Sequence, residues 1–354
     1  MNNSEKLKPE ISAYNVLLCI LVIFIHVSSS PVTTLAKRTW QSAVVFMPWR
    51  LSAFCVQGFI FLSGLKHFLN YGTKPDYRKF YFSRIKRIII PYIIWNIIYF
   101  SYYVLRGYIA YSPRDLGIYI LNGSLVSPFY FIVIIIQFYA LAPVWHKMVQ
   151  KINPIFMLVL SAILTFLLGQ YLPETIKLIN PRWSICYNDR VFTTYLFYWV
   201  AGCYAGINYE KFVNIVRQNR VFITIWFSII TLTESILSYL SFSEIKPIYW
   251  IENIHYLYCV SAVLFFFMFF AAIYEKRSLD NKFIKAVNNA SYDIYLIHCL
   301  FIYFINSTMN FIGISDIAIT YFIRIIVVYS CSIGISILIG HVRTMITSRK
   351  HLKI

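Results

Sequence analysis

The chain has 354 residues, of which 59% are hydrophobic and only 13% are charged. A soluble domain carries about 25% charged residues, so this composition excludes an ordinary soluble protein and indicates an integral membrane protein. The formal net charge of +18 does not indicate a nucleic-acid-binding protein, because the basic residues lie in short clusters between apolar segments. Such clusters set the orientation of membrane helices.

The first long apolar segment, Ile11 to Ser30, contains no Lys, Arg, Asp or Glu. A segment of this length can cross the hydrocarbon core of a bilayer as a helix, and it carries an ionisable side chain, His26, near its far end. An ionisable group inside a membrane helix is costly and therefore marks a candidate functional site. The alternative is a structural role, in which His26 pairs with neighbouring hydroxyls such as those of Ser28 and Ser29. The segment by itself leaves both interpretations open.

Ten apolar segments predict an all-α polytopic fold in one domain, residues 1–354, without internal repeats. The segments between the spans are predicted to be loops, including 31–49 and 107–127. An even number of spans places both termini on one side of the membrane, and the segments on that side carry most of the Lys and Arg residues, so both termini are predicted to be cytoplasmic. The predicted spans are 11–30, 51–70, a third that begins with IIIPYIIW and ends near 106, 128–145, 154–172, 191–209, 221–240, 255–274, 290–309 and 317–340.

The most basic loop precedes the third span and contains Arg84, Lys86 and Arg87. Arg84 and Arg87 are three residues apart, so on a helix they would share one face. Two guanidinium groups suit a phosphate-bearing ligand, because each can form bidentate charge-assisted hydrogen bonds. The alternative is a basic cluster at the membrane surface that contacts lipid headgroups.

Two further charged residues, Glu234 and Arg324, fall inside predicted spans, and we expect them to pair because unpaired charges are rare in membranes. In the ninth span, Asp293 and His298 are five residues apart, which does not place them on one helical face, so a direct Asp–His dyad is not expected. The cysteines and histidines show no metal-ligand spacing, so we expect no metal.

Five motifs follow one another along the chain, each in its own span. They are His26 in LVIFIHVSS, GFIFLSGLKHF at Gly58 to Phe68, Arg84 and Arg87 before a span containing Pro91, PFYFIVIIIQFYALAPV at Pro128 to Val144, and SYDIYLIH at Ser291 to His298. Together these motifs resemble the membrane-bound acyltransferase family 3. Many members of this family have an arginine eleven residues before the histidine of the first span, where this chain has Asn15.

The resemblance implies an O-acyltransferase that moves an acyl group, acetyl or else succinyl, from cytoplasmic acyl-coenzyme A to a hydroxyl of an extracytoplasmic carbohydrate or cell-envelope polymer. His26 would act as the general base on that hydroxyl, or would carry the acyl group transiently. Arg84, Arg87 and Lys86 would hold the coenzyme phosphates, and Tyr130 or Tyr139 would donate to the developing oxyanion. The remaining candidates for substrate binding are Asn15, Gln137 and His298.

The expected partners are the lipid bilayer, the acyl-coenzyme A donor, the glycan acceptor and a separate extracytoplasmic or polysaccharide-synthesis protein. The likeness to bacterial members implies a bacterial cytoplasmic membrane. Two other functions remain open. One is a polysaccharide exporter in which His26 lines the path, although the inverted repeats and broken helices typical of transporters are not evident. The other is a membrane scaffold or sensor without chemistry.

Overall fold

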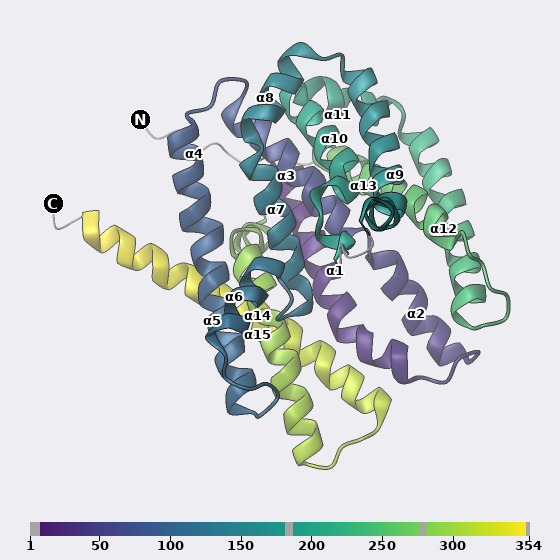
Figure 1. Ribbon diagram of the computed structural model, residues 1–354, viewed down its shortest axis with the longest axis vertical. Coiled ribbons are helices and arrows are strands. Elements are labelled where there is room, and N and C mark those ends of the chain that lie inside the picture. Colours follow the sequence, from purple (N-terminus) through teal and green to yellow (C-terminus); the bar gives the residue numbers. More distant parts are fainter. Residues whose placement is uncertain (1–7, 181–186, 277–280, 352–354) are drawn as a thin grey trace. The chain divides into compact units, whose positions relative to one another are not determined.

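The computed structural model describes residues 8–180, 187–276 and 281–351, and in this part of the chain helices are joined by short connections, without strands (Figure 1). Within it, eight helices are long and apolar enough to cross a membrane, or nine if the bent pair Pro113–Asn122 and Ser127–Ala140 counts as one span. The predicted all-α polytopic fold is confirmed. The count falls below ten at two predicted spans. The sixth, 191–209, contains a helix of only 12 residues, α10 (Leu196–Ile207), and the fourth, 128–145, counts only as part of the bent pair.

The helices form two compact units, Met1–Val56 with Val213–Ile354, and Gln57–Phe212. The first unit contains α1 (Pro9–Thr34), α2 (Trp40–Ser52), α12 (Arg220–Phe242), α13 (Ile251–Lys276), α14 (Lys282–Phe311) and α15 (Ile317–His351). The second contains most of α3 (Cys55–Tyr71), then α4 (Tyr77–Arg84), a π-helical turn (Ile85–Ile89), α5 (Ile90–Leu105), α6 (Pro113–Asn122), α7 (Tyr130–Ala140), α8 (Ala142–Lys151), α9 (Pro154–Ile179) and α10. Helix α11 (Tyr209–Gln218) crosses from the second unit to the first.

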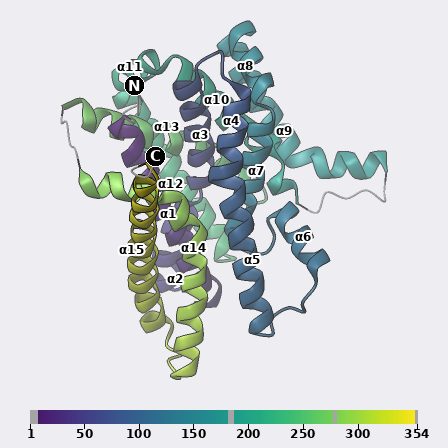
Figure 2. The same ribbon diagram turned by 90° about the vertical axis from the view of Figure 1, so that its left-hand side faces the viewer.

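In the first unit, α1 is the central helix. It packs against α2, α13, α14 and α15, and α14 lies alongside α15 (Figure 2). The apolar window of α1 is 67% buried, a larger share than in any other candidate span of the described residues. The polar side chains of α1, including those of Asn15 and Ser28, are buried among these neighbours and are thereby kept away from lipid.

The predicted loop 31–49 is wrong, because α1 continues through Pro31 and α2 occupies most of the remainder. Pro31 has no N–H group, so the carbonyl of Val27, four residues earlier, loses its helical donor. The guanidinium of Arg324 replaces that donor, with its Nη1 atom 3.2 Å from the Val27 oxygen. The helix therefore tolerates a proline that, by sequence reasoning, should end it.

Capping side chains start two short helices inside segments that were predicted as loops. The Thr39 hydroxyl accepts a hydrogen bond from the Ser42 N–H at the start of α2. The Ser112 hydroxyl accepts from the Asp115 N–H at the start of α6. Each cap satisfies a backbone N–H that has no partner within its helix.

In the second unit, α3 and α10 pack with their backbones in close contact. A Cβ atom added at Gly202 would lie 2.2 Å from the carbonyl oxygen of Phe61, and one at Gly206 would lie 2.3 Å from that of Leu65. Gly64 of α3 faces Trp199 of α10 in the same way, at 2.6 Å. Small residues at such spacing let membrane helices approach closely.

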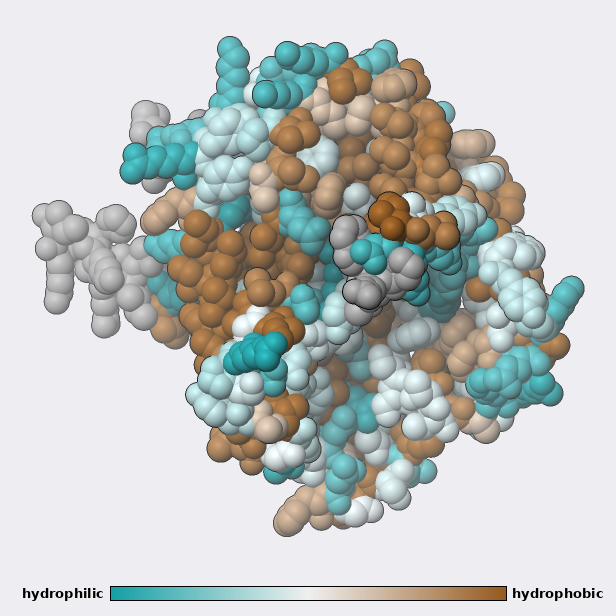
Figure 3. Space-filling view, in the orientation of Figure 1, coloured by the Kyte–Doolittle hydropathy of each residue, from teal (hydrophilic) through white to brown (hydrophobic). Residues whose placement is uncertain are grey.

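Large apolar side chains are exposed along several helices, and Figure 3 shows hydrophobic residues over much of the visible face. Ile155 and Phe156 on α9 and Ile225, Ile229 and Leu232 on α12 are examples. A soluble monomer rarely exposes apolar patches of this extent, and these side chains have the character of a lipid-facing surface. The protein is a multi-pass membrane protein.

Candidate active site

Two histidines meet in the first unit. The imidazole rings of His26 on α1 and His298 on α14 lie side by side, with their centroids 5.2 Å apart. His298 is fully buried, and its Nδ1 donates to the Ile294 carbonyl oxygen at 3.2 Å. Its Nε2 is therefore the acceptor atom and lies 3.4 Å from the thiol of Cys299. These contacts hold the His298 ring in one tautomer and one orientation beside His26.

The His26 ring is half-buried and forms no hydrogen bond with any residue that the structure describes. The hydroxyls that the sequence offered as partners are engaged elsewhere. The Ser28 hydroxyl lies 2.9 Å from the Tyr321 hydroxyl, and the Ser29 hydroxyl donates to the Ile25 carbonyl at 2.7 Å. A pairing of His26 with these serines is therefore wrong. The unprotonated ring nitrogen of His26 is therefore available to accept a proton, as a general base must.

Polar groups continue from this histidine pair along the contact of α1 with α14. Toward the start of α1, the Asn15 amide donates to the Ser291 hydroxyl at 3.1 Å. The position at which many family members have an arginine is thus buried against α14. Asn15 lies about 16 Å along the helix from His26, at about 1.5 Å per residue.

Arg324 continues the polar groups on the other side of His26. It is 5% exposed, and its Nε donates to the side-chain oxygen of Asn306 at 3.0 Å. The predicted Glu234–Arg324 pair is wrong, because Glu234 accepts hydrogen bonds from Arg50 at 2.9 Å and lies 2.8 Å from Nδ1 of His255. Sequence could not choose between these partners, because the choice depends on which helix faces which.

Asp293 pairs with Arg343 of α15 at 2.9 Å and not with His298. The absence of an Asp–His dyad among these described residues is as the sequence predicted. Their separation by five positions turns the two side chains toward different neighbours.

In the second unit, Arg84 lies at the end of α4 and packs against three aromatic rings. Its guanidinium carbon is 4.6 Å from the ring centroid of Tyr139, 5.1 Å from that of Phe80 and 5.7 Å from that of Tyr71. The Nε atom of Arg84 is buried without a hydrogen-bond partner among the described residues. Lys66 of α3 is close enough to interact electrostatically with it. A buried donor without an acceptor is rare in a folded protein and calls for an explanation, such as a ligand.

Arg87 and Lys86 have different surroundings from Arg84. Both lie in the π-helical turn Ile85–Ile89 and are exposed. In this turn the Ile90 N–H donates to the Ile85 carbonyl, five residues back, so the spacing of side chains differs from that of an α-helix. Arg84 and Arg87 are therefore near in sequence but differ in environment. Arg84 packs on aromatic rings, whereas Arg87 is exposed.

The remaining candidates from the sequence also lie in the second unit. Gln137 uses both ends of its amide on the backbone, donating to the Arg190 carbonyl at 2.8 Å and accepting from the Phe192 N–H at 3.1 Å. These bonds fix the turn that leads into α10. Tyr139 is buried under Arg84, whereas Tyr130 is half-buried at the start of α7.

Sequence reasoning missed a second pair of histidines. The Nε2 atoms of His67 on α3 and His146 on α8 lie 2.9 Å apart, and both residues are buried. His67 falls inside the GFIFLSGLKHF motif, but no spacing rule connects it with His146. Only the packing of the two helices could reveal the pair.

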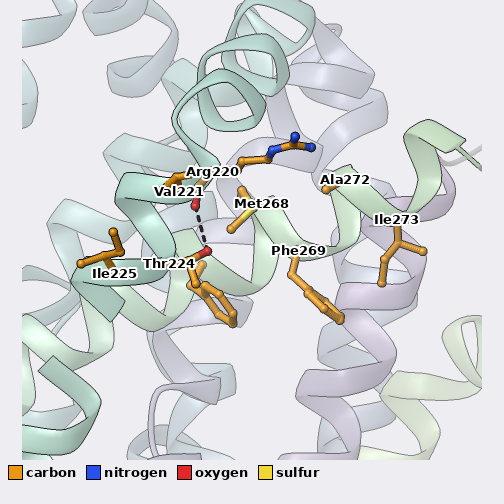
Figure 4. Close-up of a pocket in the computed structure, with 9 residues that line it drawn as sticks. Arg220, Val221, Thr224, Ile225, Met268, Phe269, Ala272 and Ile273 are labelled. Atoms are coloured by element: carbon orange, nitrogen blue, oxygen red, sulfur yellow. Dashed lines mark hydrogen bonds between the residues drawn. The ribbon is translucent and has the colours of Figure 1, made fainter. Parts of the chain in front are cut away.

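An apolar cavity of about 850 Å³ lies between α12 and α13 (Figure 4). Its lining includes Ile225, Met268, Phe269 and Ile273, with Arg220 at one end. The Thr224 hydroxyl is bonded to its own helix, donating to the Arg220 carbonyl at 2.8 Å. The lining offers no nucleophile or base, so the cavity suits hydrocarbon chains and not acyl-transfer chemistry.

Comparison with known proteins identifies relatives of this chain and its family. A 25% identical protein from Staphylococcus epidermidis, named "Probable poly-beta-1,6-N-acetyl-D-glucosamine export protein", aligns over 327 residues, which is 88% of each chain. A protein of the same name from Staphylococcus aureus (strain MSSA476) is also 25% identical, over 88% of this chain and 89% of its own. No solved structure matches the chain. The sequence profile of a family described as "Acyltransferase domain" matches residues 15–341, which include parts of both compact units. The chain therefore belongs to the membrane-bound acyltransferase family 3.

Proposed function

We propose that this protein transfers an acetyl group from acetyl-coenzyme A to a hydroxyl of an extracytoplasmic glycan, with His26 as the general base. The observation that carries the proposal is the half-buried imidazole of His26, which has no hydrogen-bond partner among the described residues and lies beside the fixed ring of His298. An ionisable group kept unpaired inside a membrane helix has a cost, which a catalytic role accounts for.

In the proposed reaction, His26 accepts the proton of the acceptor hydroxyl while the hydroxyl oxygen attacks the thioester carbonyl carbon. The tetrahedral intermediate then collapses, the carbon–sulfur bond breaks, and the coenzyme thiolate takes the proton from the imidazolium. The products are an O-acetyl ester and free coenzyme A. His298 has its Nδ1 committed to its own helix, so its proposed role is to position His26.

We assign the coenzyme phosphates to Arg84, with Arg87 and Lys86 as weaker contributors. The Nε–H group of Arg84 has no acceptor among the described residues and can donate to a phosphate oxygen. The rings of Tyr139 and Phe80 hold the guanidinium in place through cation–π contacts. The predicted orientation places this basic segment at the cytoplasmic surface, where coenzyme A is found.

Export without chemistry is the second candidate, and the names of the staphylococcal relatives favour it. Those names also support a glycan containing N-acetylglucosamine as the molecule that this protein handles. In both cases the protein acts in a bacterial cytoplasmic membrane, together with polysaccharide-synthesis proteins. Release of free coenzyme A that depends on the glycan separates the two functions, because an exporter consumes no thioester.

The test measures coenzyme A release by the purified protein in lipid nanodiscs with acetyl-coenzyme A and N-acetylglucosamine oligomers. His26→Gln should lower the rate by about 10²- to 10⁴-fold, the usual contribution of a general base, with an unchanged melting temperature. His341→Gln, at an exposed histidine of α15, is the matched control and should retain the rate. Glycan-dependent release that persists in His26→Gln would remove the base role, and no release by the wild type would favour export.

A further inference from the structure

A polar pocket of about 350 Å³ lies where α1, α14 and the start of α15 meet, within the first unit. Its volume corresponds to about a dozen water molecules, which leaves room for one sugar unit. Hydroxyl and amide groups make up much of the lining, from Ser30, Thr34, Asn306, Asn310 and Thr320, with Arg324 beside them. Such a lining offers donors and acceptors to the hydroxyls of a carbohydrate.

Arg324 gives this pocket a positive charge that no ion pair compensates within the described residues. Its Nε and Nη1 atoms donate to the neutral oxygens of Asn306 and Val27, at 3.0 and 3.2 Å. Its Nη2 atom has no hydrogen-bond partner in the same part of the chain. The nearby Asp316 carboxylate caps α15 by accepting from the Ile319 N–H at 2.8 Å. A side chain that is only 5% exposed thus retains an unused donor in the pocket it lines.

The same guanidinium connects the pocket to the proposed base. Pro31 lines the pocket and frees the Val27 carbonyl, to which Arg324 donates. Val27 follows His26 directly, so Arg324, which lines the pocket, also donates to the helical turn that carries His26. In the predicted orientation this end of α1 is extracytoplasmic, where an acceptor glycan would arrive.

We propose that this pocket, here called the Arg324 pocket, binds one sugar unit of the acceptor through a carbonyl or carboxylate oxygen carried by that sugar. The inference rests on the proposed function. Arg324 donates from Nη2 to the oxygen, and the polar lining holds the ring hydroxyls. An N-acetylated or acidic sugar fits this arrangement, whereas a sugar with a free amine would place an ammonium group against the guanidinium. Arg324 is therefore a specificity-determining residue.

The test measures binding without any acyl donor, by calorimetry on the nanodisc-embedded protein. The probes are oligomers of N-acetylglucosamine, of glucosamine and of glucuronate. The N-acetylated and acidic oligomers should bind about 10- to 100-fold more tightly than the glucosamine oligomer, as expected for one charge-assisted hydrogen bond. The comparison of the first and third probes shows whether a carbonyl or a carboxylate is preferred.

Two variants test the location, because Arg324→Gln by itself could weaken the fold around Val27. Thr320→Phe fills the pocket and leaves Arg324 in place, so it should weaken binding at least about 10-fold. Thr308→Phe, at an exposed threonine of α14 outside the pocket lining, is the control and should bind as the wild type does.

Arg324→Lys keeps the charge but loses the guanidinium geometry, and it should reduce the preference for the N-acetylated oligomer. Equal affinities for the three oligomers, or wild-type binding by Thr320→Phe, would overturn the proposal. Normal binding without coenzyme A release would instead contradict the proposed acyl transfer and leave the pocket assignment standing.

Discussion

The guanidinium of Arg50, near the end of α2, donates from Nε to the fully buried carboxylate of Glu234 on α12, at 2.9 Å. The same carboxylate oxygen lies 2.8 Å from Nδ1 of His255 on α13. Three helices of the first unit are thus joined at one carboxylate. This geometry places Glu234 among structural residues and leaves Arg324 to the pocket.

Removal of Arg50 should strongly destabilise the protein. Arg50→Met leaves the Glu234 carboxylate buried without its arginine partner, and we expect a loss of about 3–5 kcal/mol in the free energy of unfolding. Equilibrium unfolding in detergent measures this loss. Lys37→Met removes the exposed Lys37–Glu244 pair and should change the stability little, because solvent screens that pair. Equal losses in the free energy of unfolding for the two variants would show that the buried pair stabilises the protein no more than the exposed pair does.

The contact of α3 with α10 should tolerate no side chain at Gly202. In Gly202→Ala, the new methyl group meets a backbone carbonyl that cannot rotate away, so we expect a loss of about 1–3 kcal/mol and poor recovery of folded protein. Gly169→Ala in α9 is the control, since its Cβ would lie 3.9 Å from the nearest atom, on Thr194. That variant should be neutral or slightly stabilising, because alanine favours helix over glycine. Fluorescence-detected gel filtration and thermal scanning compare the two.

The stability of the second unit should fall at acidic pH because of His146, which lies outside the membrane-spanning segments. Only one proton fits between its Nε2 and that of His67, and burial lowers the pKa of His146. The unfolded imidazole has a pKa of about 6.5, so below that pH the unfolded state binds a proton that the folded state does not. The melting temperature should therefore decrease from pH 7 to pH 5. In His146→Asn, the melting temperature should depend less on pH over this range. A slope that is unchanged in His146→Asn would assign the acid sensitivity to other groups.

The two arginines should contribute unequally to donor binding. A ligand at a hundredfold excess over its dissociation constant stabilises the folded state by about 2.7 kcal/mol, which thermal scanning with acetyl-coenzyme A detects. Arg84→Ala should abolish most of this stabilisation, whereas Arg87→Ala should reduce it partly and in a salt-dependent manner, because Arg87 is exposed. Arg78→Ala, at an exposed arginine of α4, is the control. If all three variants lost the same share of the stabilisation by acetyl-coenzyme A, Arg84 would have no special role and would contribute only to a general basic surface.

Much of the fold follows from local sequence, because the bilayer imposes its thickness on every span and requires each span to satisfy its own backbone. The apolar segments around His26 and His298 therefore became helices as predicted. Segment 31–49 was misjudged because Pro31 and a polar composition usually mark a loop. The helix persists there because Arg324, distant in sequence, supplies the missing donor.

The sequence by itself determined the all-α membrane fold, the family and the identity of His26 as a candidate base. Only the tertiary structure decided which charges pair, that His26 is left without a hydrogen bond beside His298, and that Arg324 faces a polar pocket. The physical reason is that hydropathy and capping act within a few residues of each other. Partner choice for a buried charge depends instead on which helix faces which, and that is fixed by the packing of the whole unit.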